Sequence, residues 1–157
     1  MNIITWLKSY LDEVVTDIEG INRQKMVIDS SQLSKYLESH SSDFNNLLIG
    51  VLPDLNSKGD SAETFEQVAV CQFMILEKTG YSEVNYDEFF AIFEKSYSQA
   101  QLVIKKMLDQ QMRGCTVLRK LDVSSIKIVP VWNLSSCNGC NILFSFDTSL
   151  QSRKLYD

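Results

Sequence analysis

Residues 125–147 carry the strongest structural signal of the chain: they read Ser125-Ile-Lys-Ile-Val-Pro-Val-Trp-Asn-Leu134, followed by Cys137-Asn-Gly-Cys140 and Asn141-Ile-Leu-Phe-Ser-Phe-Asp147. Apolar and polar side chains alternate in the outer parts of this stretch, which is the period of a half-buried β-strand. An Asn-Gly pair between two such runs is the strongest short-range hairpin signal, because both central positions of a type I′ turn need positive φ. We therefore expect a hairpin with CNGC at its tip. Cys137 and Cys140 would face each other there, close enough to form a disulfide on oxidation.

The CxxC motif also has two chemical interpretations. A structural zinc site needs four ligands, typically two pairs at this spacing, but the chain offers one pair, the distant Cys71 and Cys115, and a single histidine, His40. In thiol–disulfide exchange a helix normally follows the first cysteine and lowers its pKa, whereas a strand is expected here. A zinc- or thiol-dependent protein centred on Cys137 and Cys140 stays an alternative. The preferred interpretation of CNGC as a hairpin turn involves no metal and no cofactor.

Helical patterns precede the hairpin. An amphipathic helix is expected from Ile3 to Ile18 and a short one from Ser30 to Ser39. Asn85-Tyr-Asp-Glu88 is a capping-box variant that predicts a long helix ending before Gly114. We expect its apolar stripe to face the core; the stripe consists of Phe89, Phe90, Phe93, Tyr97, Ala100, Ile104, Met107 and Leu108.

Two apolar runs between the helices predict strands. Leu47–Leu52 is expected to be short and to end at Pro53, with a polar loop over residues 54–64. Gln67–Leu76 is apolar on both faces, which is typical of a central strand, and the period-2 pattern resumes at residues 115–121.

The order of these elements predicts an α+β domain, with two main helices on a largely antiparallel sheet that ends in the C-terminal β-hairpin. We assign residues 1–150 to this single domain and expect residues 151–157 to be a disordered tail. At 157 residues, the chain is long enough to bury a core without metal or disulfides.

Composition and motifs exclude several functions. The net charge is −5 and basic residues are sparse, so no nucleic-acid partner is expected. No apolar run approaches the roughly 20 residues that cross a bilayer, and the N-terminus lacks the basic region of a signal peptide, so we expect no membrane partner and a cytoplasmic location. His40 is expected to be solvated at a helix end. No glycine-rich phosphate loop or nucleophile elbow occurs, so no catalytic residue is predicted.

The element order and the extended hairpin resemble the small α+β completion proteins of bacteriophage and prophage particles, namely tail terminators and head–tail adaptors. The resemblance covers most of the chain as a pattern and includes no specific motif. It implies a non-enzymatic structural protein that forms homo-oligomers, contacts other structural proteins and, if phage-derived, is part of the virion. A sensor that binds a small molecule between the long helix and the sheet is a further alternative.

The contact surfaces of such a protein would be the 54–64 loop and the 125–147 hairpin. Pro130 cannot donate to a sheet ladder, so its strand is expected at an edge, where backbone groups are open to a partner. Trp132 is of a type that anchors interfaces. The predicted interaction residues are Ile128, Pro130, Trp132, Asn138 and Gly139.

Overall fold

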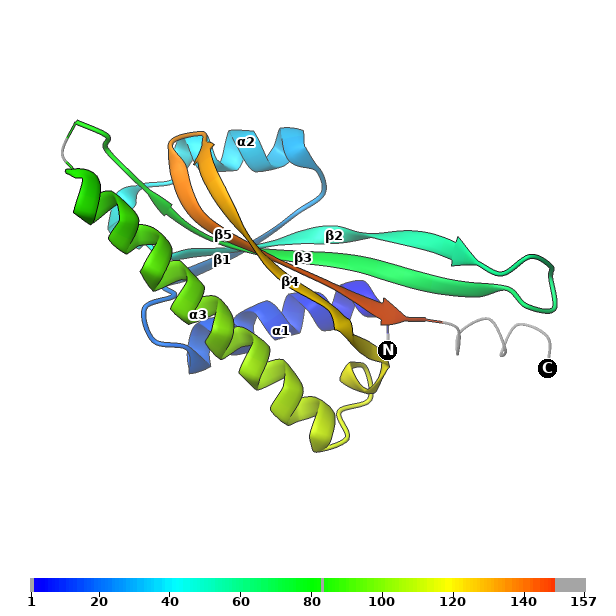
Figure 1. The fold of residues 1–157 in the computed structure, drawn as a ribbon. Coiled ribbons are helices and arrows are strands. Elements are labelled where there is room, and N and C mark those ends of the chain that lie inside the picture. Colours follow the sequence, from blue (N-terminus) through cyan, green and yellow to red (C-terminus); the bar gives the residue numbers. More distant parts are fainter. Residues whose placement is uncertain (1, 83, 149–157) are drawn as a thin grey trace.

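The computed structural model describes residues 2–82 and 84–148 and has an α+β fold, which confirms the predicted class (Figure 1). The predicted tail, residues 151–157, lies outside the described residues. The helices are α1 (Ile3–Asp17), α2 (Ser30–Ser39) and α3 (Tyr86–Met112), with short 3-10 helices η1 (Ser42–Phe44) and η2 (Leu118–Lys120). The strands are β1 (Arg23–Val27), β2 (Leu47–Lys58), β3 (Glu66–Lys78), β4 (Leu121–Leu134) and β5 (Cys137–Asp147).

The five strands form one mixed sheet in the order β1-β2-β3-β5-β4. The β1–β2 pair is parallel and the other pairs are antiparallel. Helices α1 and α3 pack on one face of the sheet, whereas α2 packs on the other. The predicted arrangement of two main helices on a largely antiparallel sheet therefore fits only roughly, because a third helix covers the second face and β1 adds a parallel edge.

Polar side chains fix where the helices begin. The side chain of Asn2 accepts a hydrogen bond from the Ile4 amide, and that of Asn85 accepts one from the Glu88 amide at 2.9 Å, as the capping pattern predicted. Helix α2 is capped by Asp29, which accepts from Gln32, rather than by a serine. Each cap supplies a partner to an amide that the helix itself leaves unpaired.

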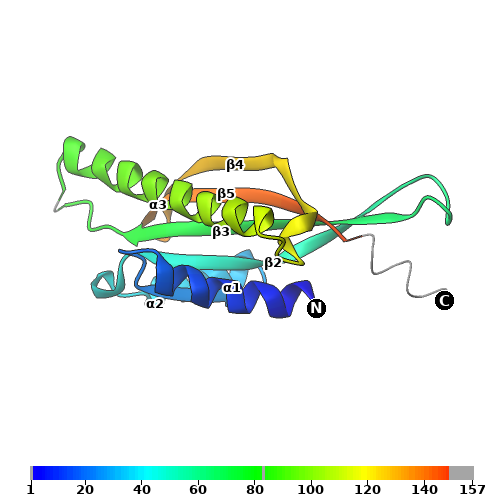
Figure 2. The same ribbon diagram turned by 90° about the horizontal axis from the view of Figure 1, so that it is seen from below.

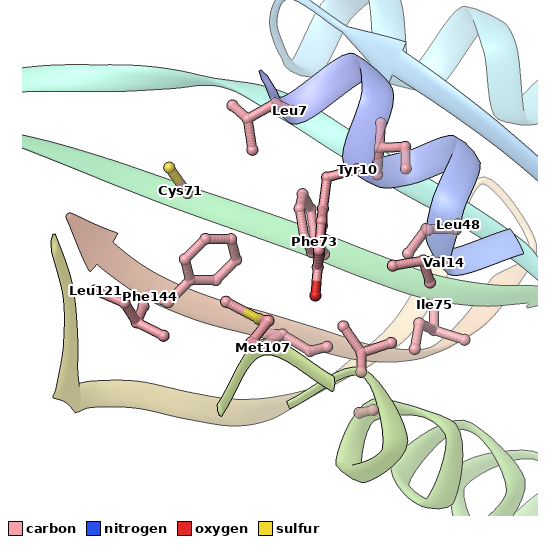
Figure 3. Close-up of a cluster of buried hydrophobic side chains, with 14 of the residues drawn as sticks. Leu7, Tyr10, Val14, Leu48, Cys71, Phe73, Ile75, Met107, Leu121 and Phe144 are labelled. Atoms are coloured by element: carbon pink, nitrogen blue, oxygen red, sulfur yellow. The ribbon is translucent and has the colours of Figure 1, made fainter. Parts of the chain in front are cut away.

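The main core lies between the sheet and helices α1 and α3 (Figure 3). Its centre is aromatic: the Phe73 ring lies 4.9 Å from Phe144 in an edge-to-face contact and 6.1 Å from Tyr10. Met107 of α3 closes the cluster and is fully buried. A smaller core lies between the other face and α2, around Leu33, Leu37 and Leu47. Both faces of β3 are thus covered, as its apolar sequence predicted.

Three local predictions were wrong. Strand β1 was not expected, because its sequence Arg-Gln-Lys-Met-Val is short and begins with three polar residues, and only Val27 is buried. Strand β2 does not stop at Pro53 but continues to Lys58, with a register irregularity between Val51 and Asp54. A proline is tolerated there because β1 pairs with β2 only as far as Val51, so the outer side of Pro53 has no ladder to break. Of residues 115–121, expected as a strand, residues 115–120 form a turn and η2, and only Leu121 belongs to a strand, β4.

The continuation of β2 to Lys58 changes the shape of the molecule. Residues 54–67 form a two-stranded projection instead of a loop, and we call this segment the arm (Figures 1 and 2). Strand β5 ends opposite Val68, so the arm extends past the rest of the sheet. Within the described residues, no helix is long and apolar enough to cross a membrane.

Candidate interaction surface

The Cys137–Cys140 segment is the beginning of strand β5 and not a turn. The β4–β5 hairpin turns at Ser135 and Ser136, whose φ angles are 49° and 63°, and Leu134 pairs with Cys137 across it. Positive φ at both central positions is what a type I′ turn requires. The hairpin was predicted correctly, but its tip lies a few residues earlier than expected. The apolar environment of the two cysteines outweighs the local preference of Asn-Gly for a turn.

The two thiols of this segment lie on opposite faces of the sheet. Cys137 is in the core beneath α2, whereas Cys140 is in the core beneath α1 and α3. Both are fully buried, and burial raises the pKa of each thiol to about 11. The prediction that the two cysteines face each other across the turn, close enough for a disulfide, was therefore wrong, and they do not form the shared site that zinc binding or thiol exchange would need. No group of three or more potential metal ligands occurs within residues 2–82 and 84–148.

Asn138 and Gly139, predicted as contact residues, are buried as well. The Asn138 side chain accepts a hydrogen bond from the Asn133 amide at 2.8 Å and donates one to the Tyr81 hydroxyl at 3.2 Å. Gly139 has φ of 155°, and a Cβ atom there would overlap the backbone carbonyl of Ile75 in β3. Asn138 thus holds the end of β4 in place, and Gly139 permits the close approach of β3 and β5.

His40 is also buried, although it was expected to be solvated. Only 3% of the residue is exposed, and its Nε2 lies 3.0 Å from Oδ1 of Asn45. Burial lowers the pKa of His40, so the neutral imidazole is favoured. Asn45 also accepts from the Lys78 amide and donates to the Lys78 carbonyl, so these side chains fasten the end of α2 to β3. This arrangement serves structure, since it joins chain segments far apart in sequence.

The three remaining predicted contact residues lie on β4, at the edge of the sheet. Ile128 pairs with Ile142 and packs against the main core, and Pro130 is exposed opposite Cys140. Trp132 is 71% exposed. Its neighbour Val131 packs into the α2 core, so alternation along the strand directs Trp132 to the face that carries α3.

The half of α3 that begins at Tyr86 carries aromatic rings that the sheet does not cover. The buried residues of α3 are Ile92, Ser96, Gln99, Ala100, Val103 and Met107. Tyr86 and Phe90, by contrast, are 75% and 48% exposed. The prediction that the aromatic stripe faces the core was therefore wrong at this end. Helical spacing shows that the rings share a face, but the first turns of α3 extend past the ends of β3 and the β4–β5 hairpin (Figures 1 and 2).

These rings form one contiguous group, which we call the aromatic surface and define as Tyr81, Tyr86, Phe89, Phe90 and Phe93. Neighbouring ring centroids are 4.7 Å apart for Tyr86 and Phe90, 5.3 Å for Phe89 and Phe93, and 6.2 Å for Tyr81 and Phe89. These distances are typical of interacting aromatic pairs. The rings hold one another in place, so the surface is preformed.

Strand β4 is joined to the aromatic surface through the residue that follows Trp132. The Tyr81 hydroxyl donates a hydrogen bond to Oδ1 of Asn133, the residue that follows Trp132, at 2.9 Å. Together with Trp132, the exposed parts of Tyr81, Tyr86 and Phe90 amount to about 470 Å², if a whole aromatic side chain presents about 200 Å². A patch of that size equals the largest patch of a typical monomer, and such patches commonly mark interaction sites.

Charge is distributed unevenly along the same helix. Asp87, Glu88 and Glu94 are exposed beside the aromatic surface. Lys95 is paired with Glu77 of β3 at 3.8 Å, and the remaining basic residues of α3 belong to the other end of the helix. The aromatic surface therefore has an acidic rim, which favours a partner with basic groups around an apolar centre.

An open hollow lies on the α1 side of α3, between the end of α1 and the last turns of α3. Its lining is mostly charged and includes the ion-paired Lys106 and Asp17. This is not the place where a small-molecule site was expected. The side of α3 that faces the sheet is filled by fully buried residues such as Ala100 and Val103.

The chain matches no protein-family model, and no curated protein shows significant sequence similarity to it. The aromatic surface was not predicted as a site. The signal that could have indicated it is the density of rings at Tyr86, Phe89, Phe90 and Phe93 within the first turns of one helix.

Proposed function

We propose that this protein is a non-enzymatic structural protein that assembles with copies of itself and with other structural proteins. The observation that carries the proposal is the aromatic surface together with the exposed Trp132. Large rings in water are unfavourable for a monomer, since about 25 cal/mol is gained per Å² of apolar surface removed from water. Tyr and Trp are enriched among the residues that dominate binding energy at interfaces.

The geometry of the surface supports a protein partner. The rings have few rotatable bonds and already contact one another, so little side-chain entropy is lost on binding. The patch of about 470 Å² is smaller than the roughly 800 Å² per partner of a standard interface, so the acidic rim would belong to the contact as well. We expect the partner surface to present apolar groups surrounded by Lys or Arg.

The finer proposal is that the protein is a tail or neck completion component of a phage-like particle. It is supported by the pattern resemblance, which implies ring-shaped assemblies, and by the projecting arm, which is suited to reach a neighbouring subunit. The location would then be the virion as well as the cytoplasm. Genes for portal, capsid or tail proteins beside the gene for this chain would support the proposal, and a neighbourhood without them would count against it.

The test of the general proposal compares two positions on the same helix. Phe90 in the aromatic surface is 48% exposed, and Leu102, outside it, is 51% exposed. We expect Phe90→Ser to lower the mass of the purified protein measured by light scattering after size exclusion, because it removes a ring from the contact. Leu102→Ser is the matched control and should leave the mass unchanged, since it removes a similar exposed fraction elsewhere.

Equal masses for the wild type and Phe90→Ser would contradict a role of the aromatic surface in self-association. A pull-down of structural proteins by the wild type, lost in Phe90→Ser and kept in Leu102→Ser, would support its role toward other partners. Circular dichroism should show that both variants are folded, because neither side chain is in the core.

A further inference from the structure

We propose that the arms of two copies pair edge to edge, antiparallel, across a two-fold axis at Asn56, and join the two sheets into one. This proposal rests on self-association as the proposed function, but it concerns a different surface. The aromatic surface lies at the beginning of α3, whereas the arm projects from the opposite end of the sheet (Figure 1).

The first observation is an open strand edge. Residues Asp54–Lys58 of β2 pair on one side with Val70–Glu66 of β3, in unbroken register. On the other side β1 ends its pairing at Val51, and no other strand of residues 2–82 and 84–148 pairs there. Every residue from Asp54 to Lys58 is exposed. A regular strand edge with free amide and carbonyl groups is a template for a strand of another chain.

The second observation is the charge pattern of this edge, which is complementary to itself. If Asn56 of one copy lies opposite Asn56 of the second copy, Asp54 lies opposite Lys58 of the second copy, and the pair occurs twice. Asp54 and Lys58 are on the same face of the strand because they are four residues apart. Opposite charges directly across an antiparallel pair stabilise it. Moving the axis to Ser57 would instead place Asp54 opposite Asp60 of the second copy.

Lys58 is well placed for this contact. Within its own copy it lies opposite Glu66. The pKa of Asp122 is lowered by the hydrogen bond from Ser124 and also by the charge of Lys58, so the lysine lies within electrostatic reach of β4. The second copy would add Asp54 on the free side of Lys58. The lysine would then lie between carboxylates of two chains, and this fixes the register.

The other two sheet edges are less suited to pairing. Strand β4 contains Pro130 and two register shifts, and prolines and bulges are features that protect an edge. Strand β1 has five residues with Lys25 at its centre, so an antiparallel pair of two β1 strands about Lys25 would place two lysines opposite each other. The arm is thus the edge at which a second copy fits best.

A charge exchange tests the register. Asp54→Lys places two lysines opposite each other, and Lys58→Asp places two aspartates opposite each other, twice in each dimer. We expect each variant alone to dimerise about 30-fold more weakly than the wild type in sedimentation velocity. This corresponds to about 2 kcal/mol, if two attractive pairs become two repulsive ones. An equimolar mixture of the two variants should regain wild-type dimerisation, because a dimer of one Asp54→Lys chain and one Lys58→Asp chain again has opposite charges in both facing pairs.

Glu63→Lys is the control for Asp54→Lys, since it changes the net charge by the same amount in the turn of the arm, outside the proposed pair. Weakening by Asp54→Lys and Lys58→Asp, recovery in the mixture and no effect of Glu63→Lys would establish the paired arms. A mixture that stays as weak as the single variants would overturn the register. Self-association that is insensitive to both exchanges but abolished by Phe90→Ser would overturn this inference and leave the proposed function intact.

A crosslink gives an independent measurement. Because Asn56 lies on the proposed axis, Asn56→Cys should form an intermolecular disulfide under mild oxidation, in a Cys115→Ser background that removes the partly exposed native thiol. Leu55→Cys is the matched control. Each Leu55 would lie opposite Ser57 of the other copy, so the two Leu55→Cys residues would be diagonal neighbours about 7–8 Å apart, too far for a disulfide. Equal crosslinking of the Leu55→Cys and Asn56→Cys variants would contradict the axis at Asn56.

Discussion

Replacing Gly139 by alanine would show whether the CNGC segment is part of a strand or an exposed turn. Gly139 lies in β5 between β3 and β4, opposite Leu76 and Val131. An alanine Cβ would overlap the carbonyl oxygen of Ile75 and would lie 3.0 Å from its carbonyl carbon and 3.3 Å from the Leu76 Cα. These are backbone atoms of a central strand, so relief requires β3 and β5 to move apart.

The expected cost combines two effects. Overpacking of a well-packed interior costs about 1–3 kcal/mol. A residue with a side chain at φ of 155° adds backbone strain of about 1–3 kcal/mol. Taking the middle of each range, we expect Gly139→Ala to lose about 4 kcal/mol, a large part of the roughly 5–15 kcal/mol that stabilises a typical domain. With an m-value of about 2 kcal/mol/M, the urea midpoint should fall by about 2 M.

Gly50→Ala is the matched control for urea unfolding. Its Cβ would lie 2.8 Å from the Cδ1 atom of Leu11, which is the flexible end of a side chain, and its backbone has no unusual φ. We expect a loss of about 1–2 kcal/mol there, at the lower end of overpacking costs. If Gly139→Ala were no more destabilising than Gly50→Ala, the placement of CNGC inside the sheet would be refuted, and an exposed turn would explain the result better.

Three further predictions concern the turn, the histidine and the thiols. Exchanging Ser135-Ser136 for Asn-Gly should stabilise the protein by about 1 kcal/mol and raise the melting temperature by about 2–4 °C, because both positions have positive φ; an unchanged or lower value contradicts the turn. Burial lowers the pKa of His40 below 6.5, so the unfolded chain binds the proton first; its contribution to stability is complete above about pH 6.5 and is lost as pH falls through the folded pKa. His40→Gln should therefore show a smaller loss of stability on acidification than the wild type, and equal losses would show that the histidine is solvated. Cys115, which is half-buried, should react with an aromatic disulfide reagent before the other three thiols, whose pKa values are raised by burial to about 11 or 12; fast reaction of Cys137 or Cys140 would contradict their burial.

Periodic segments of the sequence allowed most elements to be predicted. Helices α1 and α3 and strand β3 follow from apolar spacing and from the cap at Asn85. Strand β1 could not be found in this way, because a short edge strand with alternating exposed residues has no strong pattern. The turn predicted at CNGC was wrong for the opposite reason. The sequence carries a strong local turn signal there, but burial of Cys137 and Cys140 on two faces of the sheet favours a strand. The free energies that set the local backbone preference of a residue range from a few tenths of a kcal/mol to about 1 kcal/mol. Burial of a large apolar side chain contributes about 1.5–3 kcal/mol.

The candidate site shows a different limit of sequence reasoning. Spacing correctly placed the rings of α3 on one face of a helix, but it cannot show whether another element covers that face. The cover depends on where the ends of β3, β4 and β5 lie relative to the first turns of α3. Trp132 was predicted as a contact residue and is 71% exposed, whereas Asn138 and Gly139 are buried because the turn lies at Ser135 and Ser136.

Sedimentation equilibrium of the wild-type chain tests the central proposal most directly. The chain has a mass of 17.9 kDa, and two surfaces at opposite ends of the molecule are proposed to contact further copies. We expect the average mass to rise with concentration to that of a dimer or a larger assembly. A mass that stays at 17.9 kDa up to the highest soluble concentration would contradict self-association, and with it the proposed pairing of the arms.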